Sequence, residues 1–391
     1  MTIRELDQQY IANTYNRFDL TLVRGSGAFC YDESGREWID LGAGIAVNTF
    51  GMADGDWIAA VSEQLRKVQH TSNLYYTEPC AKLAAMLCQR TGMQSVFFSN
   101  SGAEANECAI KTARKYSFDR YGVGRSTILT LQNSFHGRTI TTLSATGQDG
   151  FHTSFFPFTD GFDYLPANDL SALDRLDNDA GLCAVMIEMI QGEGGVNVLT
   201  DAYVQAVAAH CAQNDLLLIV DEVQTGNGRT GQLYAYMHAG ILPDIVTTAK
   251  GLGGGLPIGA TLFGKKTAGV LTPGTHGSTF GGNPVCAAGA CSILSRLDDA
   301  LLASVAEKGE WVRETLSNAD GVVSVSGRGL MLGIETIRPA AAVAADCIAR
   351  GVLVLTAKTK VRLLPPLNIP WDALKKAVAI IKEVCRTWNT C

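Results

Sequence analysis

The chain has 391 residues, of which 47% are hydrophobic, and its formal net charge is −6 at pH 7. This length predicts two or three structural units, or one large domain with a smaller one attached, and the composition is ordinary for a globular protein. A weakly acidic chain does not favour nucleic-acid binding. No apolar run approaches the ~18 residues of a membrane span, so we expect neither a nucleic-acid nor a membrane partner.

The cysteines and the N-terminus indicate a cellular compartment. The opening residues "MTIRELDQQY" lack the apolar segment of a signal peptide, and the 11 cysteines form no CxxC pair. Scattered cysteines in a chain of this length are typical of reduced thiols in a cytosol. Six histidines without paired spacing give no indication of a zinc site. We therefore expect a cytoplasmic protein that binds no metal ion.

In chain order, the first recognisable element is a hairpin at residues 25–44, where apolar residues alternate around a "DESG" turn. The middle of the chain then alternates short apolar runs with longer helical patterns, which is typical of an α/β domain with a mainly parallel sheet. From about residue 286 the pattern changes to long helices, short strands and a final helix. The strands expected in the middle part are residues 95–99, 126–131, 182–190, 216–223, 244–249 and 259–264.

These patterns divide the chain into two parts. We expect a large α/β domain over residues 46–285 and a smaller α+β domain formed by residues 1–45 together with residues 286–391. A helix over residues 102–122 has a stripe of small residues at the spacing of a buried face. In open parallel sheets, ligands bind beyond the carboxyl ends of the strands, so polar groups at those ends are the candidates for a site.

Lys250 stands at the end of the expected strand 244–249, and four of the next five residues are glycines. A lysine at a strand tip is often only a surface charge. A lysine that is partly desolvated near fixed positive charge has a lowered pKa, however, and its amine becomes a nucleophile. The glycines would let the backbone pass close to a planar ligand.

Two further strand ends carry polar groups. Gly102 and Ala103 open a helix, where backbone N–H groups favour a phosphate, although Ser101 also suits an ordinary helix cap. Asp221 ends an apolar strand. It is either a solvated loop carboxylate or the partner of a protonated ring nitrogen, which a pyridine cofactor needs to act as an electron sink.

A third strand end is followed by "NSFHGRT", which contains Phe135 and Arg138. Phe135 could stack on an aromatic ring, and Arg138 could hold a carboxylate, although a single Phe is more often part of a core and a single Arg a surface charge. A phosphate cradle, a stacking ring, a strand-end carboxylate and Lys250 together match the needs of pyridoxal phosphate held as a Schiff base.

Seven motifs in order extend this match over nearly the whole chain: "SNSGAEANECAIKTARK", "NSFHGRT", "EMIQGEGG", "LIVDEVQTGNGRTG", "TTAKGLGGGLPIGA", "HGSTFGGNP" and "RGLMLGIE". With them the chain resembles the class III aminotransferases of the fold-type I group, which use pyridoxal phosphate. Its N-terminal segment and "TSNLYYTEPCAKLA" are most similar to the acetylornithine aminotransferases of that class. Met52 and Met189 depart from the family pattern, which often has histidine and proline there.

The resemblance implies roles in holding the cofactor. Lys250 would form the Schiff base and carry the proton, and Asp221 would pair with the pyridine nitrogen. Thr279 would reach the phosphate of the neighbouring subunit, so the active site would lie at a homodimer interface. The residues expected to bind the cofactor are Ser101, Gly102, Ala103, Phe135, Asp221, Glu222, Val223, Gln224, Lys250 and Thr279.

The resemblance also implies contacts with substrates. Arg362 would bind the α-carboxylate of glutamate or 2-oxoglutarate, and Glu193 would pair with Arg362 while the other substrate is bound. Arg138 and Ser278 match positions that contact acetylornithine, and Tyr15 matches a tyrosine near the substrate.

The implied reaction moves the terminal amine of N2-acetylornithine to 2-oxoglutarate. It gives N-acetylglutamate 5-semialdehyde and glutamate, a step of arginine biosynthesis. The alternatives are another ω-aminotransferase, acting on succinylornithine, ornithine or 4-aminobutyrate, and an aminomutase or decarboxylase with the same cofactor. Ile45 falls where a tyrosine would favour free ornithine, which lowers that alternative.

Overall fold

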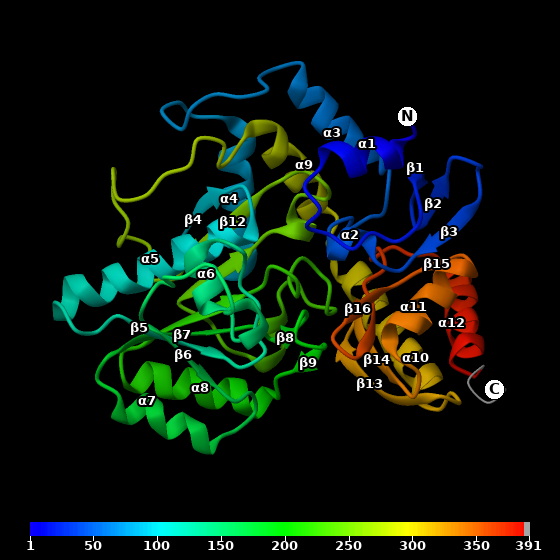
Figure 1. The fold of residues 1–391 in the computed structure, drawn as a ribbon. Coiled ribbons are helices and arrows are strands. Elements are labelled where there is room, and N and C mark those ends of the chain that lie inside the picture. Colours follow the sequence, from blue (N-terminus) through cyan, green and yellow to red (C-terminus); the bar gives the residue numbers. More distant parts are fainter. Residues whose placement is uncertain (387–391) are drawn as a thin grey trace.

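A seven-stranded sheet forms the centre of the larger part of the molecule in the computed structural model, which describes residues 1–386 (Figure 1). Only β12 runs against its neighbours, β4 and β11; all other adjacent pairs are parallel. The expected α/β fold with a mainly parallel sheet is confirmed. In spatial order the strands are β4 (Ser95–Ser99), β12 (Gly259–Phe263), β11 (Ile245–Thr248), β10 (Leu217–Asp221), β7 (Leu182–Ile187), β5 (Thr127–Leu131) and β6 (Phe162–Leu165).

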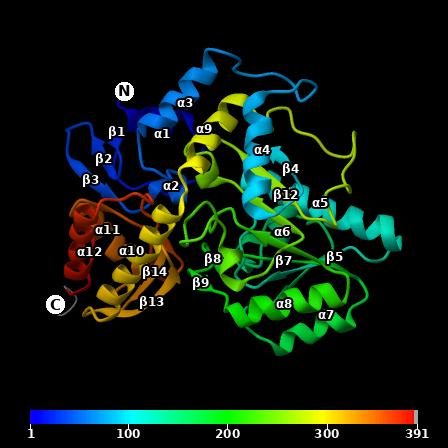
Figure 2. The same ribbon diagram turned by 180° about the vertical axis from the view of Figure 1, so that it is seen from behind.

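Helices cover both faces of this sheet, as parallel strands require. In Figures 1 and 2, α5 (Gly102–Tyr121) and α8 (Asp201–Gln213) lie on opposite sides of the strands. Strands β7, β10, β11 and β12 are buried along their whole length. The predicted stripe of α5 faces the sheet, with its members all buried: Ala105, Cys108, Ala109, Thr112 and Ala113. The sheet and these helix faces therefore form the main core.

The smaller part contains a four-stranded antiparallel sheet in the order β13 (Val322–Arg328), β14 (Met331–Thr336), β17 (Lys360–Leu363) and β16 (Leu355–Ala357). Three helices accompany it: α10 (Asp299–Ser317), α11 (Ala340–Ala349) and α12 (Trp371–Arg386). The N-terminal strands β1 (Leu22–Ser26), β2 (Phe29–Asp32) and β3 (Glu37–Asp40) join this part, because β15 (Val352–Leu353) pairs in parallel with β3. The predicted hairpin therefore packs with the C-terminal residues.

We propose that the chain divides into domains of residues 46–285 and of residues 1–45 with 286–391. The pairing of β3 with β15 supports this division. The second boundary falls in α9 (Pro284–Ser295), which packs against α3 (Gly55–Leu65) and α4 (Glu78–Thr91). The remaining elements are α1 (Ile3–Tyr10), α2 (Ala43–Ala46), α6 (Ile140–Ala145), α7 (Asp174–Asn178), β8 (Ile190–Gln191), β9 (Asn197–Val198) and four short 3-10 turns.

Three details differ from the sequence-based expectation. Strand β6 was not predicted, because it is a short edge strand whose residues are mostly half-buried and include an aspartate. Two predicted strands are shorter than expected, since β7 stops at Ile187 and β10 stops at Asp221. At both points the chain leaves the sheet and turns polar side chains toward the edge where ligands bind. Among residues 1–386, no helix is both long enough and apolar enough to cross a bilayer.

Candidate active site

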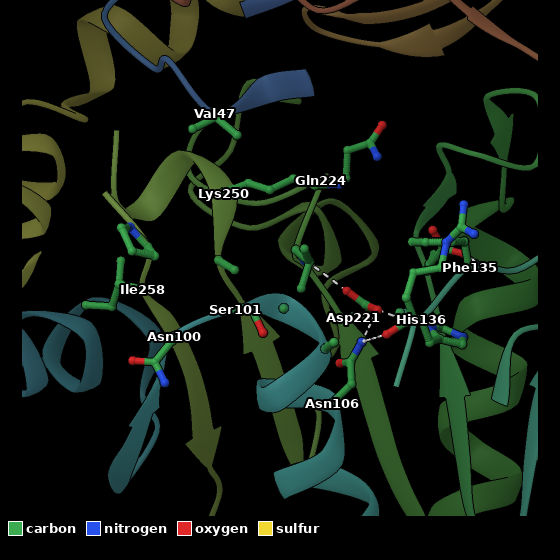
Figure 3. Close-up of a pocket in the computed structure, with 18 of the residues that line it drawn as sticks. Val47, Asn100, Ser101, Asn106, Phe135, His136, Asp221, Gln224, Lys250 and Ile258 are labelled. Carbon is green, nitrogen blue, oxygen red and sulfur yellow. Dashed lines mark hydrogen bonds and ion pairs between the residues drawn. The ribbon is translucent and has the colours of Figure 1, made fainter. Parts of the chain in front are cut away.

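The carboxyl ends of the parallel strands surround a cavity of about 440 Å³, a size typical of small-molecule sites (Figure 3). It lies next to the N-terminus of α5, which contributes Gly102 and Ala103 to its lining. Nine of the residues that the sequence singles out line this one cavity: Ser101, Gly102, Ala103, Phe135, Arg138, Asp221, Val223, Gln224 and Lys250.

Lys250 follows β11 and begins a 3-10 turn with a φ of 45°, an uncommon conformation for a residue with a side chain. Among residues 1–386, the Lys250 Nζ has no hydrogen-bond or ion-pair partner, and in Figure 3 the side chain points into the cavity. Burial lowers the pKa of Lys250, and the Arg362 guanidinium lowers it further, while nearby carboxylates act in the opposite direction. The net lowering favours the neutral, nucleophilic amine.

The glycines after Lys250 have a different role from the one expected. A Cβ on Gly251 would lie 2.9 Å from Thr49 Oγ1, and one on Gly253 would lie 2.0 Å from the Leu256 carbonyl oxygen. These two glycines therefore allow the protein to pack tightly behind Lys250. Only Gly255 among them lines the cavity.

Asp221 is held in one orientation by three donors. Its Oδ1 accepts a hydrogen bond from the Val223 N–H at 3.0 Å, and its Oδ2 accepts from Asn106 Nδ2 at 2.8 Å. The His136 Nδ1 lies 2.8 Å from the same Oδ2, so this nitrogen carries the proton that the carboxylate accepts. Both Asn106 and His136 are buried. Such a fixed, buried carboxylate suits a protonated ring nitrogen.

Asn106 and His136 line the cavity, yet sequence reasoning did not select them. Their signals were present, since Asn106 lies one helical turn after Gly102 and His136 directly follows Phe135. Glu188 is a third lining residue that was missed.

The N-terminus of α5 forms another wall. Ser101 caps the helix, since its Oγ accepts a hydrogen bond from the Glu104 N–H at 3.2 Å, and Gly102 and Ala103 follow at the cavity. A Cβ on Gly102 would lie 2.6 Å from Val223 Cγ1, so only glycine allows Val223 to pack there. The helix cap and an anion site at the first turn of this 20-residue helix are thus compatible.

Arg138 and two aromatic rings lie together at another part of the cavity wall. The Arg138 guanidinium carbon lies 5.5 Å from the centroid of the Phe135 ring and 4.4 Å from that of Phe151. The two rings pack edge to face at 5.9 Å. Stacking keeps Arg138 extended at the cavity while leaving its N–H groups available for a carboxylate.

A second arginine approaches from the smaller sheet. Arg362 on β17 lies 2.7 Å from Glu193 Oε1 and donates a hydrogen bond of 3.0 Å to Gln224 Oε1. Burial acts to raise the pKa of Glu193, but the Arg362 charge outweighs it and the pKa is lowered, so the carboxylate stays ionised. Gln224 also donates to Glu193 at 3.2 Å and lines the cavity, so the three groups form one network at its edge.

Comparison with known proteins identifies the family to which this chain belongs. A family model described as aminotransferase class-III matches residues 10–385. The chain belongs to this family. It is 53% identical to the acetylornithine aminotransferase of Haemophilus ducreyi over 384 residues, which cover 98% of each protein. It also resembles the N-acetylornithine aminotransferase of Stenotrophomonas maltophilia, with a TM-score of 0.84, 36% identity and 97% coverage of both chains.

Solved ornithine aminotransferases have the same fold as this aminotransferase. The enzyme from Toxoplasma gondii superposes with a TM-score of 0.94 at 31% identity, covering 98% of this chain and 94% of the other. Similarity of fold therefore does not indicate whether the amine donor is acetylated ornithine or free ornithine.

Class III aminotransferases use pyridoxal phosphate, and the residues of the cavity fit this cofactor. Asp221 would hold its ring nitrogen, and Gly102 and Ala103 would hold its phosphate at the start of α5. Lys250, with no partner of its own among residues 1–386, would join its carbonyl carbon. Phe135 and Val223 also line the space that the ring would fill. Met52 and Met189, which depart from the family pattern, do not line this cavity.

Six of the expected site residues do not line the cavity of this single chain: Arg362 and Glu193, which form the network at its edge, and Glu222, Tyr15, Ser278 and Thr279. Glu222 turns away from it and accepts hydrogen bonds from Thr225 Oγ1 at 2.6 Å and the Tyr236 N–H at 2.8 Å, so its assignment to the cofactor is not supported. Tyr15 is exposed, beside Arg17.

Ser278 lies next to the cavity rather than in it. It is reached by the Asn100 side chain, whose Nδ2 is 3.2 Å from Ser278 Oγ, and Asn100 lines the cavity. Thr279 is exposed on the same loop, where a residue assigned to a neighbouring subunit would be accessible.

Glu222 makes the stability of this aminotransferase depend on pH. Burial raises the pKa of Glu222 to about 7, so the folded protein holds a proton there that the unfolded chain releases near pH 4.5. The contribution of this bound proton to the free energy of unfolding is fully present below about pH 4.5 and is lost as the pH rises through about 7. We expect Glu222→Gln to gain about 3 kcal/mol over wild type across that range. Thermal unfolding of both proteins at several pH values tests this, and a pH-independent difference would contradict it.

Proposed function

We propose that this enzyme transfers the terminal amine of N2-acetylornithine to 2-oxoglutarate, giving N-acetylglutamate 5-semialdehyde and glutamate. The observation that carries the proposal is the pair of buried Arg362 and half-buried Glu193 beside the cavity, with Arg138 as a separate cation. Glutamate has two carboxylates and needs two cations, so Glu193 must release Arg362 when glutamate binds. N2-acetylornithine has one carboxylate, which Arg138 can hold while Arg362 remains paired with Glu193.

The residues of the chain have distinct tasks in this reaction. When bound, pyridoxal phosphate supplies a carbonyl carbon that an amine can join and a ring that accepts electron density from the amino carbon. Asp221 keeps the ring nitrogen protonated, which strengthens that electron acceptance. Lys250 Nζ would take the proton from the donor carbon that bears the transferred amine and would return it to the carbonyl carbon that this amine has joined. Phe135 and Val223 exclude water from the faces of the ring.

We also propose a homodimer that completes the site. The loop at residues 71–77 exposes Leu74, Tyr75 and Tyr76, and Asn73 ties this loop to the one that carries Ser278 and Thr279 by hydrogen bonds of 3.0 and 2.9 Å. A contiguous exposed apolar surface next to an active site is typical of an obligate interface, and a second copy of the chain fits it. Sedimentation should give about twice the mass of one chain; a monomer with full activity would contradict the proposal.

A cytoplasmic location is the third part of the proposal. The ten cysteines of residues 1–386 are all unpaired thiols, which suits a reducing compartment. Fractionation of cells that express the protein should recover it with cytoplasmic markers, and recovery in a secreted fraction would contradict this location.

A panel of donors tests the substrate assignment. The holoenzyme is incubated with 2-oxoglutarate and acetylornithine, succinylornithine, ornithine or 4-aminobutyrate, and glutamate formation is followed. We expect the highest kcat/KM with acetylornithine. Preference for ornithine would favour the second candidate, which the superposition on ornithine aminotransferases supports, and would leave the role of Lys250 intact.

A further inference from the structure

Glu188 is a buried carboxyl group in the wall of the cavity that has no part in the proposed reaction. It directly follows β7, and β7 lies between β10, which ends at Asp221, and β5, whose following loop carries Phe135. Glu188 therefore stands between Asp221 and Phe135 along the edge of the sheet. Its Oε2 accepts a hydrogen bond of 2.9 Å from the Phe135 N–H.

The loop that carries Phe135 depends on side chains for its position. It runs from the end of β5 to α6 without regular structure and includes Asn133 and Gly137 at positive φ. Two side chains hold the next residue, His136: Thr146 accepts from its N–H at 3.0 Å, and Asn106 donates to its carbonyl oxygen at 2.7 Å. Glu188 supplies the corresponding contact at Phe135 itself, where the ring faces the cavity.

The charged surroundings determine the protonation state of Glu188. The titratable and charged groups around it are Asp221, His136, Arg138, Lys250, Glu193 and Arg362. Asp221 accepts three hydrogen bonds, and Glu193 is paired with Arg362. Within residues 1–386, Glu188 accepts only one hydrogen bond, from the Phe135 N–H. Burial, together with the Asp221 charge, raises the pKa of Glu188 well above its usual range.

We propose that Glu188 is a positioning residue that holds the Phe135 amide and so fixes the Phe135 ring against the bound cofactor. The raised pKa favours the neutral acid, which still offers a carbonyl oxygen to the Phe135 N–H. The inference rests on the proposed cofactor site but not on the identity of the amine donor.

Hydrogen exchange at the Phe135 amide in the apoprotein tests the contact without any turnover. We expect exchange about tenfold faster in Glu188→Ala, and exchange within about twofold of wild type in Glu188→Gln, which keeps the acceptor oxygen. Ser144→Ala is the matched control, because Ser144 accepts from the Thr159 N–H at 3.0 Å outside the cavity. Unchanged exchange in Glu188→Ala, or failure of glutamine to restore protection in a folded protein, would overturn the contact.

The pH dependence of Lys250 labelling tests the neutral form. An amine-reactive reagent is applied to the apoproteins over a range of pH, and modification of Lys250 is measured by peptide mass spectrometry. A neutral Glu188 predicts the same labelling midpoint in wild type and Glu188→Gln. An ionised Glu188 would make the midpoint fall by about 1 pH unit in the variant, because a nearby negative charge would be lost, and would overturn the neutral-acid assignment.

Measurement of cofactor affinity tests the role of Glu188 independently of the proposed amine donor. We expect Glu188→Ala to weaken pyridoxal phosphate binding about tenfold and Glu188→Gln to restore it, with the order of preferred donors unchanged in both. A donor panel that rejects acetylornithine, with these affinities as expected, would remove the substrate assignment and keep Glu188. Unaltered affinity in Glu188→Ala would remove the role of Glu188 and keep the reaction.

Discussion

Lys250→Ala should reduce the rate of glutamate formation by at least about 10³-fold, because the variant loses both the amine that joins the cofactor and the group that moves the proton. The same variant should lose the absorbance band of cofactor joined to a lysine. Among the residues that the structure describes, no other lysine could replace Lys250 in joining the cofactor. Within residues 1–386, Lys250 is the only lysine that lines the cavity.

The control for this variant is Lys265→Ala. Lys265 is an exposed lysine just after β12, at the opposite edge of the sheet from the carboxyl ends of β10 and β11. The Lys265→Ala variant should retain wild-type turnover and the absorbance band. Near-normal turnover in Lys250→Ala would remove the assignment of this residue, whatever the donor.

Arg362→Ala has the second-largest expected effect, and the effect should be confined to one half of the reaction. Loss of a charge-assisted, two-point contact costs about 3 kcal/mol, so kcat/KM with glutamate or 2-oxoglutarate should fall by ~10²-fold or more. The half-reaction with acetylornithine should change less, because its single carboxylate is assigned to Arg138. Single-turnover absorbance changes with each substrate separate the two halves.

Two further variants sharpen this prediction. Arg362→Lys keeps the charge but lacks the planar fork, so it should recover only part of the lost activity. Arg328→Ala removes an arginine from β13 of the same sheet, where it pairs with Asp201 at 3.5 Å, and should leave both half-reactions unchanged. An unaltered glutamate half-reaction in Arg362→Ala would show that another residue holds that carboxylate.

Much of the site was accessible from the sequence because its residues follow strands that are easy to recognise. Asp221 ends a buried apolar strand, and Lys250 and Phe135 closely follow two others; parallel strands bring their carboxyl ends to one edge. The order of strands across the sheet was not predicted. It depends on crossover connections, which local patterns do not determine.

The differences between the expected site and the observed one have two causes. Asp221 and Glu222 are neighbours at a strand end, and successive side chains there point to opposite sides, so only Asp221 faces the cavity. The roles of His136, Asn106 and Glu188 depend on contacts between distant parts of the chain. No local pattern indicates that Glu188 meets the Phe135 amide, because 53 positions separate them in the sequence.

The most direct test of the account follows the transferred nitrogen. N2-acetylornithine labelled with 15N at its terminal amine is incubated with the holoenzyme and 2-oxoglutarate, and the products are analysed by mass spectrometry. We expect labelled glutamate and unlabelled N-acetylglutamate 5-semialdehyde in equal amounts. When 2-oxoglutarate is omitted, we expect no glutamate and no more than one equivalent of the semialdehyde per active site. Conversion of the donor without an acceptor, with the label kept in a rearranged or decarboxylated product, would contradict it and indicate an aminomutase or a decarboxylase.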